Sequence, residues 1–286
     1  MSIQHPSDIF PKIYGELLDK FGKPKELSID FLPNMDNKIW GLRKKQMVVV
    51  AGRVSMAKSC LLLQMAHAFA KQGKTVLFFT LEMTIQECVL RLFNAHCYVD
   101  NWANLAGISP EDHKKYELRV ADFQKHLEEL NLVFIEGYGK THEEIFKTID
   151  TIAKGKTVDA VFIDYIQMIR VGNKTDKQAI DEYIKHLRVD AIAKNYCVVL
   201  GCQINRASFD GSKVNPPELH MMKSSGTIEE VMDVCFLLHW EYFYSRDKTT
   251  FNDYQIRVGK NRMGRTGIWD CHYEPKYSRI GEKHEQ

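Results

Sequence analysis

The amino-acid sequence predicts an α/β fold, with a mostly parallel central sheet flanked by helices and an antiparallel hairpin at its C-terminal edge. Six short apolar runs recur along the chain, and helical patterns separate them, which is typical of a doubly covered parallel sheet. The runs are continuous rather than alternating, as expected for strands buried on both faces. They are residues 47–51, 75–80, 132–136, 158–164, 197–202 and 234–238.

The two ends of the chain predict further elements. Residues 7–22 have the apolar spacing of a short amphipathic helix, and a polar, proline-containing stretch follows to about Leu42. This helix packs either on its own domain or on a neighbouring subunit, and the pattern favours neither. Residues 254–260 and 268–273 are strand-like and are joined by the polar turn "NRMGRTG", which predicts the edge hairpin.

Composition limits the class of protein. The 286 residues are enough for one large domain with a substantial core. Lys+Arg exceed Asp+Glu by only 39 − 37 = 2, so any nucleic-acid contact must come from a local basic patch. No apolar run reaches membrane-spanning length, and the N-terminus lacks a signal-peptide core. The seven scattered cysteines, with no CxxC pair, predict reduced, buried thiols and no zinc site on them. We expect a cytoplasmic protein.

The stretch "GRVSMAKS", residues 52–59, is close to a phosphate-binding loop. It follows a predicted strand and opens a predicted helix, the context that G-x-x-x-x-G-K-[ST] requires. Backbone N–H groups and the helix N-terminus would hold phosphates, while Lys58 would reach the outer phosphates and Ser59 would bind Mg²⁺. The nucleotide-binding candidates are Gly52, Arg53, Val54, Ser55, Met56, Ala57, Lys58 and Ser59.

Ala57 replaces the second glycine of this loop. Its Cβ would crowd the phosphates, or oppose a positive φ if the loop needs one. We favour a working but perturbed loop over a silenced one. Arg53 is either a nucleotide contact or an exposed loop arginine.

A second signal supports the site. Asp164 ends the apolar strand of "VDAVFIDYIQM", where a carboxylate can hold the Mg²⁺ water shell beside the phosphate loop. Alone it could be a turn residue; together with the loop it predicts a nucleotide site with Ser59 and Asp164 as the Mg²⁺ residues.

Five blocks, in order, resemble the RecA-like domain of DnaB-family replicative helicases, a P-loop NTPase fold. They are "GRVSMAKS" (52–59), "VLFFTLEMTIQECVLRL" (76–92), "VFIDYIQMI" (161–169), residues 201–234 from "GCQINR" to "MDV", and "GKNRMGRTG" (259–267). The N-terminal helix and "SIDFLPNMDNKIWGL" resemble the family's linker helix and lead-in segment. The resemblance therefore implies a linker and lead-in over residues 1–42 and a RecA-like ATPase domain over 43–286.

The resemblance implies roles for residues near the nucleotide. Glu82, after strand 75–80, matches the glutamate that activates the attacking water; otherwise it is a helix-start residue. Gln203 matches a γ-phosphate sensor; otherwise it is a polar strand-end residue. Lys260 and Arg262 match a cationic finger that acts in the next subunit's site; otherwise they form a solvated basic turn.

The resemblance also implies partners. Family members hold single-stranded DNA through a loop that matches residues 223–226, so Lys223, Ser224, Gly226 and, outside the loop, Arg206 are candidate DNA contacts; otherwise the loop is plain surface. ATP, Mg²⁺, a hexameric ring, and a loader or primase are implied too. Residues 1–46 are too few for the family's N-terminal helical domain, so we expect a piece of a longer protein or a compact, phage-like motor.

The leading hypothesis is an ATP-driven replicative helicase motor of a bacterial or phage-infected cell. One alternative is a degenerate RecA-like module that assembles and binds DNA or partners but hydrolyses little ATP, because of Ala57. Another is a RecA-like recombination or repair ATPase, against which the "TLEM" and "KNRMGRTG" blocks argue.

Overall fold

A computed structural model describes residues 25–99, 110–169, 176–204, 216–222, 226–251 and 253–283, with short pieces at 6, 10–11, 14–15, 209–210 and 213–214. Of the predicted N-terminal helix over 7–22, positions 10, 11, 14 and 15 are described, and all four are helical. The rest of that predicted helix lies outside the described residues.

The described strands form a nine-stranded sheet in the order β11-β10-β9-β8-β1-β5-β4-β2-β3. The six strands from β8 to β3 pair in parallel, and β9, β10 and β11 add an antiparallel edge, as predicted. The strands are β1 (Met47–Gly52), β2 (Val76–Thr80), β3 (Leu132–Glu136), β4 (Ala160–Asp164), β5 (Cys197–Gln203), β8 (Val234–Trp240), β9 (Tyr254–Asn261), β10 (Gly267–Glu274) and β11 (Arg279–Glu282); β6 (Phe209–Asp210) and β7 (Lys213–Val214) form a separate pair.

The sheet differs from the predicted one at its two edges. β11 continues the sheet beyond the predicted hairpin, and its four residues were too few to give a pattern. β3 has no buried residue, although its apolar run predicts burial on both faces. It lies at the end of the sheet and pairs only with β2 among the described strands, so one of its sides has no neighbouring strand.

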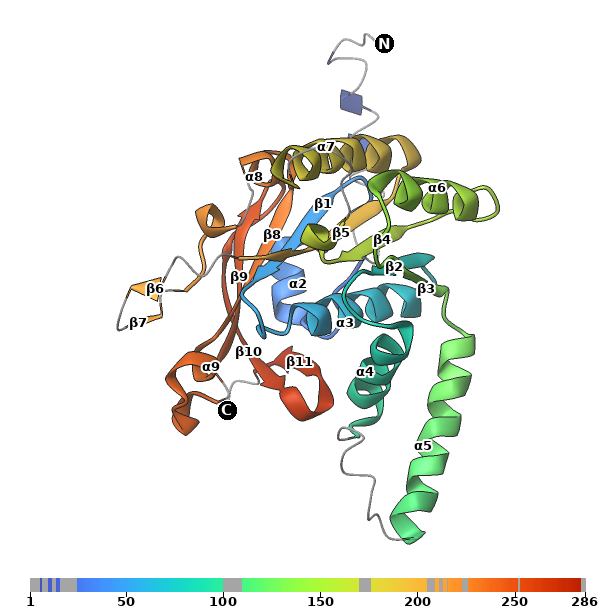
Figure 1. Ribbon diagram of the computed structural model, residues 1–286, viewed down its shortest axis with the longest axis vertical. Helices are drawn as coiled ribbons and strands as arrows, with labels where there is room; N and C mark the ends of the chain where they lie inside the picture. The colour runs from blue at the N-terminus through green and yellow to red at the C-terminus, as the bar shows by residue number, and fades with distance from the viewer. Residues whose placement is uncertain are drawn as a thin grey trace.

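Helices cover both faces of the sheet (Figure 1). On one face lie α6 (His142–Ala153), α7 (Asp176–Lys194) and α8 (Gly226–Val231); on the other lie α2 (Pro33–Ile39), α3 (Lys58–Lys71), α4 (Ile85–Cys97) and α5 (Pro110–Glu128). The remaining helical segments are η2 (Ile166–Met168), η4 (Leu219–Met221), α9 (Glu241–Ser245), η5 (Lys248–Thr250) and η6 (Pro275–Tyr277).

Each face of the sheet has its own hydrophobic core, because side chains alternate along a strand. In β1, Val48 and Val50 point into the core that contains α3, whereas Met47, Val49 and Ala51 point into the core that contains α7. Ten residues of α3 are buried, so this helix fills the space beneath the sheet. The burial fixes the start of α3 next to the end of β1.

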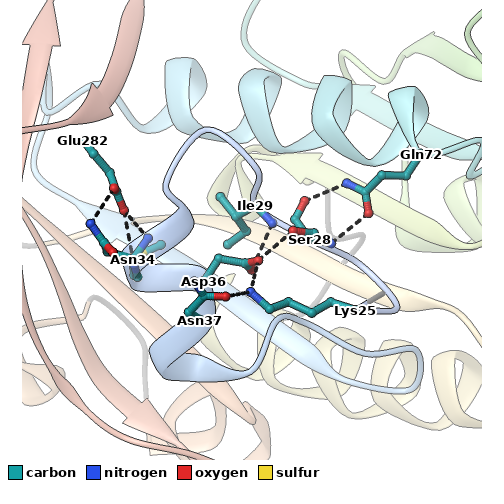
Figure 2. Close-up of polar contacts among 9 residues, drawn as sticks. Lys25, Ser28, Ile29, Asn34, Asp36, Asn37, Gln72 and Glu282 are labelled. Carbon is teal, nitrogen blue, oxygen red and sulfur yellow. Dashed lines mark hydrogen bonds and ion pairs between the residues drawn. The ribbon is translucent and has the colours of Figure 1, made fainter. Parts of the chain in front are cut away.

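The lead-in segment, residues 25–42, packs into the same core as the residues that follow it. Six of its apolar side chains are buried (Leu27, Ile29, Leu32, Met35, Ile39 and Leu42), whereas Trp40 is exposed. Leu27 exchanges two backbone hydrogen bonds with Leu42. The Gln72 side chain, at the end of α3, donates to the Ser28 carbonyl at 2.8 Å and accepts from the Ser28 N–H at 3.0 Å (Figure 2). The domain boundary between residues 42 and 43 stays a prediction.

Buried Asp36 organises the turn of the lead-in (Figure 2). Its carboxylate accepts hydrogen bonds from the Ile29 N–H at 3.0 Å, from the Ser28 hydroxyl at 2.6 Å and from Lys25 Nζ at 2.6 Å. Asn34 donates through its side-chain amide to Glu282 at 2.8 Å, which ties α2 to β11. The three contacts of Asp36 satisfy its buried charge, whose desolvation would otherwise be costly.

Two further sequence predictions can be compared with the fold. All seven cysteines are free; six are buried and Cys97 is partly buried, which agrees with the expectation of reduced thiols. Among the described residues, no helix is long and apolar enough to cross a membrane.

Candidate nucleotide site

Four strand ends meet at one edge of the sheet. Gly52 at the end of β1 lies beside Gln203 at the end of β5, and Thr80 at the end of β2 lies beside Asp164 at the end of β4. Because the four strands are parallel, their carboxyl ends form a common edge, which is where open α/β sheets bind ligands. The candidate loop leaves this edge from β1 and enters α3.

The loop needs left-handed backbone at two positions. Ser55 has φ +64° and Ala57 has φ +57°, and Ala57 is the residue from which α3 begins. Left-handed conformation costs a residue with a Cβ about 1–2 kcal/mol. The substitution of the usual glycine by Ala57 therefore leaves the loop formed but strained. The Ala57 side chain is partly buried and packs against the core that contains α3.

Steric crowding explains why position 52 is a glycine. A Cβ at Gly52 would lie 3.2 Å from Met56 Cβ and 3.3 Å from Lys58 Cγ, because the loop folds back over the end of β1. The buried Met56 fixes the middle of the loop, and its carbonyl accepts a 3.0 Å hydrogen bond from the Tyr254 hydroxyl of β9. Val54 and Ser55 are exposed at the tip.

Arg53 is not the exposed loop arginine of one sequence interpretation. Its side chain is 6% exposed, and its guanidinium carbon lies 5.3 Å from the centroid of the Tyr244 ring. The alternative of an exposed arginine is therefore wrong. Its other predicted role, a nucleotide contact, stays a prediction.

Lys58 lies at the meeting point of the candidate charges. Its ammonium donates to the Arg53 carbonyl at 3.0 Å across the loop. Burial lowers the pKa of Lys58, while the charges of Asp164 and Glu82 raise it. Both carboxylates are therefore close enough to act on one ammonium group. Three of the predicted site residues thus lie near one another, and their role in phosphate binding stays a prediction.

Asp164 is a buried carboxylate without a strong partner. It is 1% exposed, and neither of its oxygens has a well-aligned hydrogen bond from another described residue. Burial raises its pKa from 3.8 to about 6, opposed by the nearby Ser59 hydroxyl and Lys58 ammonium. A carboxylate and a hydroxyl are the oxygen ligands that Mg²⁺ prefers, directly or through water. The unsatisfied oxygens of Asp164 thus fit a bound Mg²⁺.

Glu82 is exposed two residues beyond β2 and reaches the same edge. The N–H of the preceding Leu81 donates to the Asp164 carbonyl at 2.9 Å, which holds the two strand ends together. Glu82 is not a first-turn residue of α4, because that helix has Thr84 as N-cap and a capping box with Glu87. The helix-start interpretation of Glu82 is therefore wrong.

Gln203 is held by a residue that the sequence interpretation missed. The Gln167 side chain, in η2, accepts from the Gln203 N–H at 3.2 Å and donates to the Gln203 carbonyl at 3.3 Å. Gln167 lies three residues after Asp164, within the quoted "VFIDYIQMI" block. Its position in that block, which resembles the helicase family, was the signal by which the sequence could have identified it. It fixes the end of β5 relative to the end of β4.

Lys260 and Arg262 lie at the opposite edge of the sheet, where the parallel strands have their amino ends. β9 runs antiparallel to β8, so Asn261 pairs with Val234, which in turn pairs with Val48 at the start of β1. Lys260 donates to the Glu229 carbonyl and Arg262 to the Glu230 carbonyl, both in α8. The length of β1, about 16 Å, separates them from the phosphate loop. The structure does not bring these two residues to the site of their own chain.

Most of the predicted DNA contacts fall outside the described residues. These are Arg206, Lys223 and Ser224. Gly226 is exposed at the start of α8. Ile204, next to Gln203, and Met222, next to the candidate DNA loop over residues 223–226, form an isolated antiparallel bridge. The residues that flank the candidate DNA segment are thus attached to the strand that carries Gln203.

Comparison with known families gives a match over most of the chain. A family model described as "DnaB-like helicase C terminal domain" matches residues 30–282. The "Replicative DNA helicase DnaB" of Rickettsia prowazekii (strain Madrid E) is 26% identical over 280 residues, which cover 87% of this chain and 57% of the relative. The "Probable plasmid replicative DNA helicase" of Chlamydia trachomatis serovar L2 is 31% identical over 256 residues, which cover 86% of this chain and 53% of the relative. The chain thus spans little more than half the length of these relatives.

Solved structures show the same fold. One of them, described as an "ATPase Domain", superposes with a TM-score of 0.86 at 20% identity, covering 99% of this chain and all of the other. The structure of "A DnaB-Like Replicative Helicase And Its Interactions With Primase" gives a TM-score of 0.83 at 20% identity and covers 99% of this chain and 68% of the other. The predicted RecA-like fold is confirmed. The chain belongs to the DnaB-like helicase C-terminal domain family.

Proposed function

We propose that the chain is the ATP-hydrolysing motor of a replicative DNA helicase. The observation that supports this most is the convergence of Lys58, Ser59, Asp164 and Glu82 at the carboxyl edge of the sheet. The family membership of the chain agrees with it. ATP binding, translocation along single-stranded DNA and duplex unwinding are the proposed activities.

The phosphate loop, Asp164 and Glu82 would have different roles in ATP hydrolysis. The loop N–H groups and Lys58 would hold the phosphates of ATP, and Ser59 and Asp164 would hold Mg²⁺. When bound, Mg²⁺ neutralises phosphate charge. Glu82, exposed and close to Lys58, would take the proton of the attacking water. Gln203, whose backbone is hydrogen-bonded to the Gln167 side chain, would contact the γ-phosphate. Its neighbour Ile204 is bridged to Met222, so this contact would couple the nucleotide state to the candidate DNA loop after Met222.

We propose that each site is completed by the next protomer. Lys260 and Arg262 lie on the edge opposite the phosphate loop, so head-to-tail packing would place them at a neighbour's nucleotide. A head-to-tail interface that closes gives a ring, and a hexamer is the ring we propose. The central channel would bind single-stranded DNA through Lys223, Ser224, Gly226 and Arg206. A loader and a primase are further proposed partners.

One observation favours a second candidate function. Ala57 strains the loop at φ +57°, so a RecA-like module that assembles and binds DNA with little turnover needs a direct test. ATP hydrolysis by the native chain, with and without single-stranded DNA, separates the two, together with strand displacement on a forked duplex. The motor predicts DNA-stimulated hydrolysis and unwinding, both lost in Lys58→Ala. An assembled native chain that binds DNA but gives no DNA-stimulated hydrolysis would support the module instead.

Sharing of sites between protomers has its own experiment. Arg262→Ala and Glu82→Gln chains are each expected to be inactive, but their equal mixture contains interfaces in which both groups are intact. Random mixing in a closed ring leaves about one quarter of the sites complete, so activity should partly return. Assembled mixed rings with no recovery would contradict the shared site.

A further inference from the structure

Three histidines meet on the face of the domain that carries α3, α4 and α5. His67 of α3, His96 of α4 and His126 of α5 place a ring nitrogen each within 4.8 Å of the others. The Nε2 atoms of His67 and His126 are 2.7 Å apart, and the His96 and His126 rings stack with centroids 4.5 Å apart. All three side chains are partly buried. His67 lies nine residues beyond Lys58 in α3, about 13 Å from it along the helix axis, so the cluster is separate from the nucleotide site.

The surroundings of His67 and His96 disfavour protonation of their imidazoles. Burial, followed by the charges of His126, His96 and Lys71, lowers the pKa of His67 to about 3. Burial, followed by His126, also lowers the pKa of His96, against the raising effect of Asp122. Neutral imidazole is the form that binds metals, because a ring nitrogen must offer its lone pair.

We propose that His67, His96 and His126 bind a divalent transition metal of the zinc class. Three imidazole nitrogens with an open fourth position are an established ligand set for Zn²⁺. With zinc–nitrogen bonds of about 2.0–2.1 Å, tetrahedral ligands lie about 3.3 Å apart. The His67–His126 pair would therefore open by about 0.6 Å and the wider pairs would close. The stacked His96 and His126 rings would also tilt apart by side-chain rotation, so that a lone pair of each points at the same ion.

The space beside the cluster suits this arrangement. A cavity of about 180 Å³, lined by Gln64, His67, Lys71, His96 and Arg279 among others, has room for water as a fourth ligand. The two cations of this cavity have other partners: Lys71 Nζ lies 3.3 Å from an Asp30 oxygen, and the Arg279 guanidinium lies 4.1 Å from the centroid of the Tyr98 ring. The Asp30 carboxylate offsets part of the Lys71 charge that a bound cation would meet.

The metal would fasten α5 to the body of the domain. Among the described residues of α5, Phe123 alone is buried. Phe93 of α4 contacts Tyr116 and Phe123 of α5 edge-on, and His126 adds the contact to α3. Figure 1 shows α5 running away from the sheet beside α4. A metal bound by one residue from each of three helices would hold this helix more firmly than ring contacts do.

The experiment uses the whole chain, purified with a chelator and then titrated with ZnCl₂ or CoCl₂. We expect one metal per chain and, for Co²⁺, the visible absorption of a tetrahedral site. At a free Zn²⁺ concentration one hundred times the Kd, the melting temperature should rise by about 4 °C. Amide exchange in α5 should slow on Zn²⁺ addition.

Matched variants decide the assignment. His126→Gln and His96→Gln should each remove the visible band and the melting shift, whereas His113→Gln, an exposed histidine of the same helix as His126, should keep both. Melting of each variant without metal shows whether it is folded. Cys97→Ser should also keep both, because the Cys97 thiol is not part of the three-histidine cluster and lies 3.6 Å from the Arg119 carbonyl instead.

Three results would overturn the proposal. They are the absence of stoichiometric metal binding by the native chain, full binding by folded His126→Gln and His96→Gln chains, and loss of binding in Cys97→Ser. None of these readouts depends on ATP hydrolysis, so the metal site and the motor function stand or fall separately.

Discussion

The amino-end and carboxyl-end edges of the parallel strands each hold a buried aspartate, and the two aspartates differ in their polar partners. Asp233, between α8 and β8, accepts from the Met47 N–H at 2.8 Å and from Arg188 Nη2 at 3.1 Å, and lies 3.6 Å from Arg262 Nη1. Asp164, at the carboxyl edge, is buried at least as deeply but has no well-aligned partner among the described residues. Asp233 stabilises the fold, whereas Asp164 is left available for a ligand.

Backbone conformation does not distinguish the two edges in the same way. The phosphate loop at the carboxyl edge holds Ser55 and Ala57 in left-handed conformation, each at about 1–2 kcal/mol. At the opposite edge, Lys45 and Asn195, which precede β1 and β5, are also left-handed. The β8–β9 ladder has a register shift there between Cys235 and Phe236, and the Arg262 N–H donates to the Asp233 carbonyl at 2.9 Å. Unsatisfied buried charge, rather than backbone strain, thus marks the edge that we assign to nucleotide binding.

The largest expected effect comes from removing one lysine at each edge. Lys58→Ala should weaken MgATP binding by about 100-fold or more, because it removes the cation that faces the phosphates. Lys260→Ala should leave nucleotide affinity of the isolated protomer unchanged, since Lys260 lies at the other edge. Equilibrium titration with a fluorescent ATP analogue measures both. Equal losses in the two variants would show that the edges are not functionally distinct.

Charge removal at the two aspartates should have opposite effects on stability. Asp233→Asn should lower the free energy of unfolding by about 3 kcal/mol, because Arg188 loses a buried partner. Asp164→Asn should raise that free energy at pH 8, because a buried unpaired charge is removed, while abolishing MgATP hydrolysis. Urea unfolding and ATPase assays on both variants measure this contrast. A large loss of stability in folded Asp164→Asn would mean that this carboxylate has a structural partner.

The raised pKa of Asp164, about 6, predicts a pH dependence. Between about pH 4 and 6 the folded chain keeps a proton that the unfolded chain has released, so stability falls as pH rises through this window. The full effect is about 3 kcal/mol for a shift from 3.8. Melting temperatures of the native and Asp164→Asn chains between pH 4 and 7 should converge at the acid end and separate above it. Parallel profiles would contradict the assignment.

The smallest expected effect is at the loop backbone. Ala57→Gly should raise the free energy of unfolding by about 1 kcal/mol, because glycine adopts φ +57° without strain. Ala70→Gly, inside α3, is the matched control and should lower it. Affinity for MgATP should change by less than about fivefold in Ala57→Gly, the equivalent of about 1 kcal/mol. Hydrolysis that appears only in Ala57→Gly would favour the degenerate module.

The parts of the fold that follow from local pattern were predictable. Continuous apolar runs and the tail hairpin indicated eight strands, and strand ends followed by "GRVSMAKS" and "FIDY" indicated the nucleotide edge. These signals work because burial and loop geometry depend on residues close in sequence. β11 was missed because four residues with one buried side chain, Ile280, show no periodicity.

Features that depend on tertiary contacts could not be predicted. Arg53 is buried because Tyr244, almost two hundred residues later, lies against it. Gln167 is notable only because its amide meets the backbone of Gln203. The clustering of three histidines from separate helices is likewise a product of packing. The residue types were visible in the sequence, but their proximity was not.

The most direct test of the central claim is ATP turnover in two glutamate variants at the carboxyl edge. Glu82→Gln removes the proposed base, and Glu136→Gln removes an exposed carboxylate at the end of the neighbouring strand β3. We expect kcat to fall by about 100-fold or more in Glu82→Gln, with the Kd for MgATP nearly unchanged, and to stay native-like in Glu136→Gln. Equal turnover in the two variants would contradict the assignment of this edge as the catalytic site.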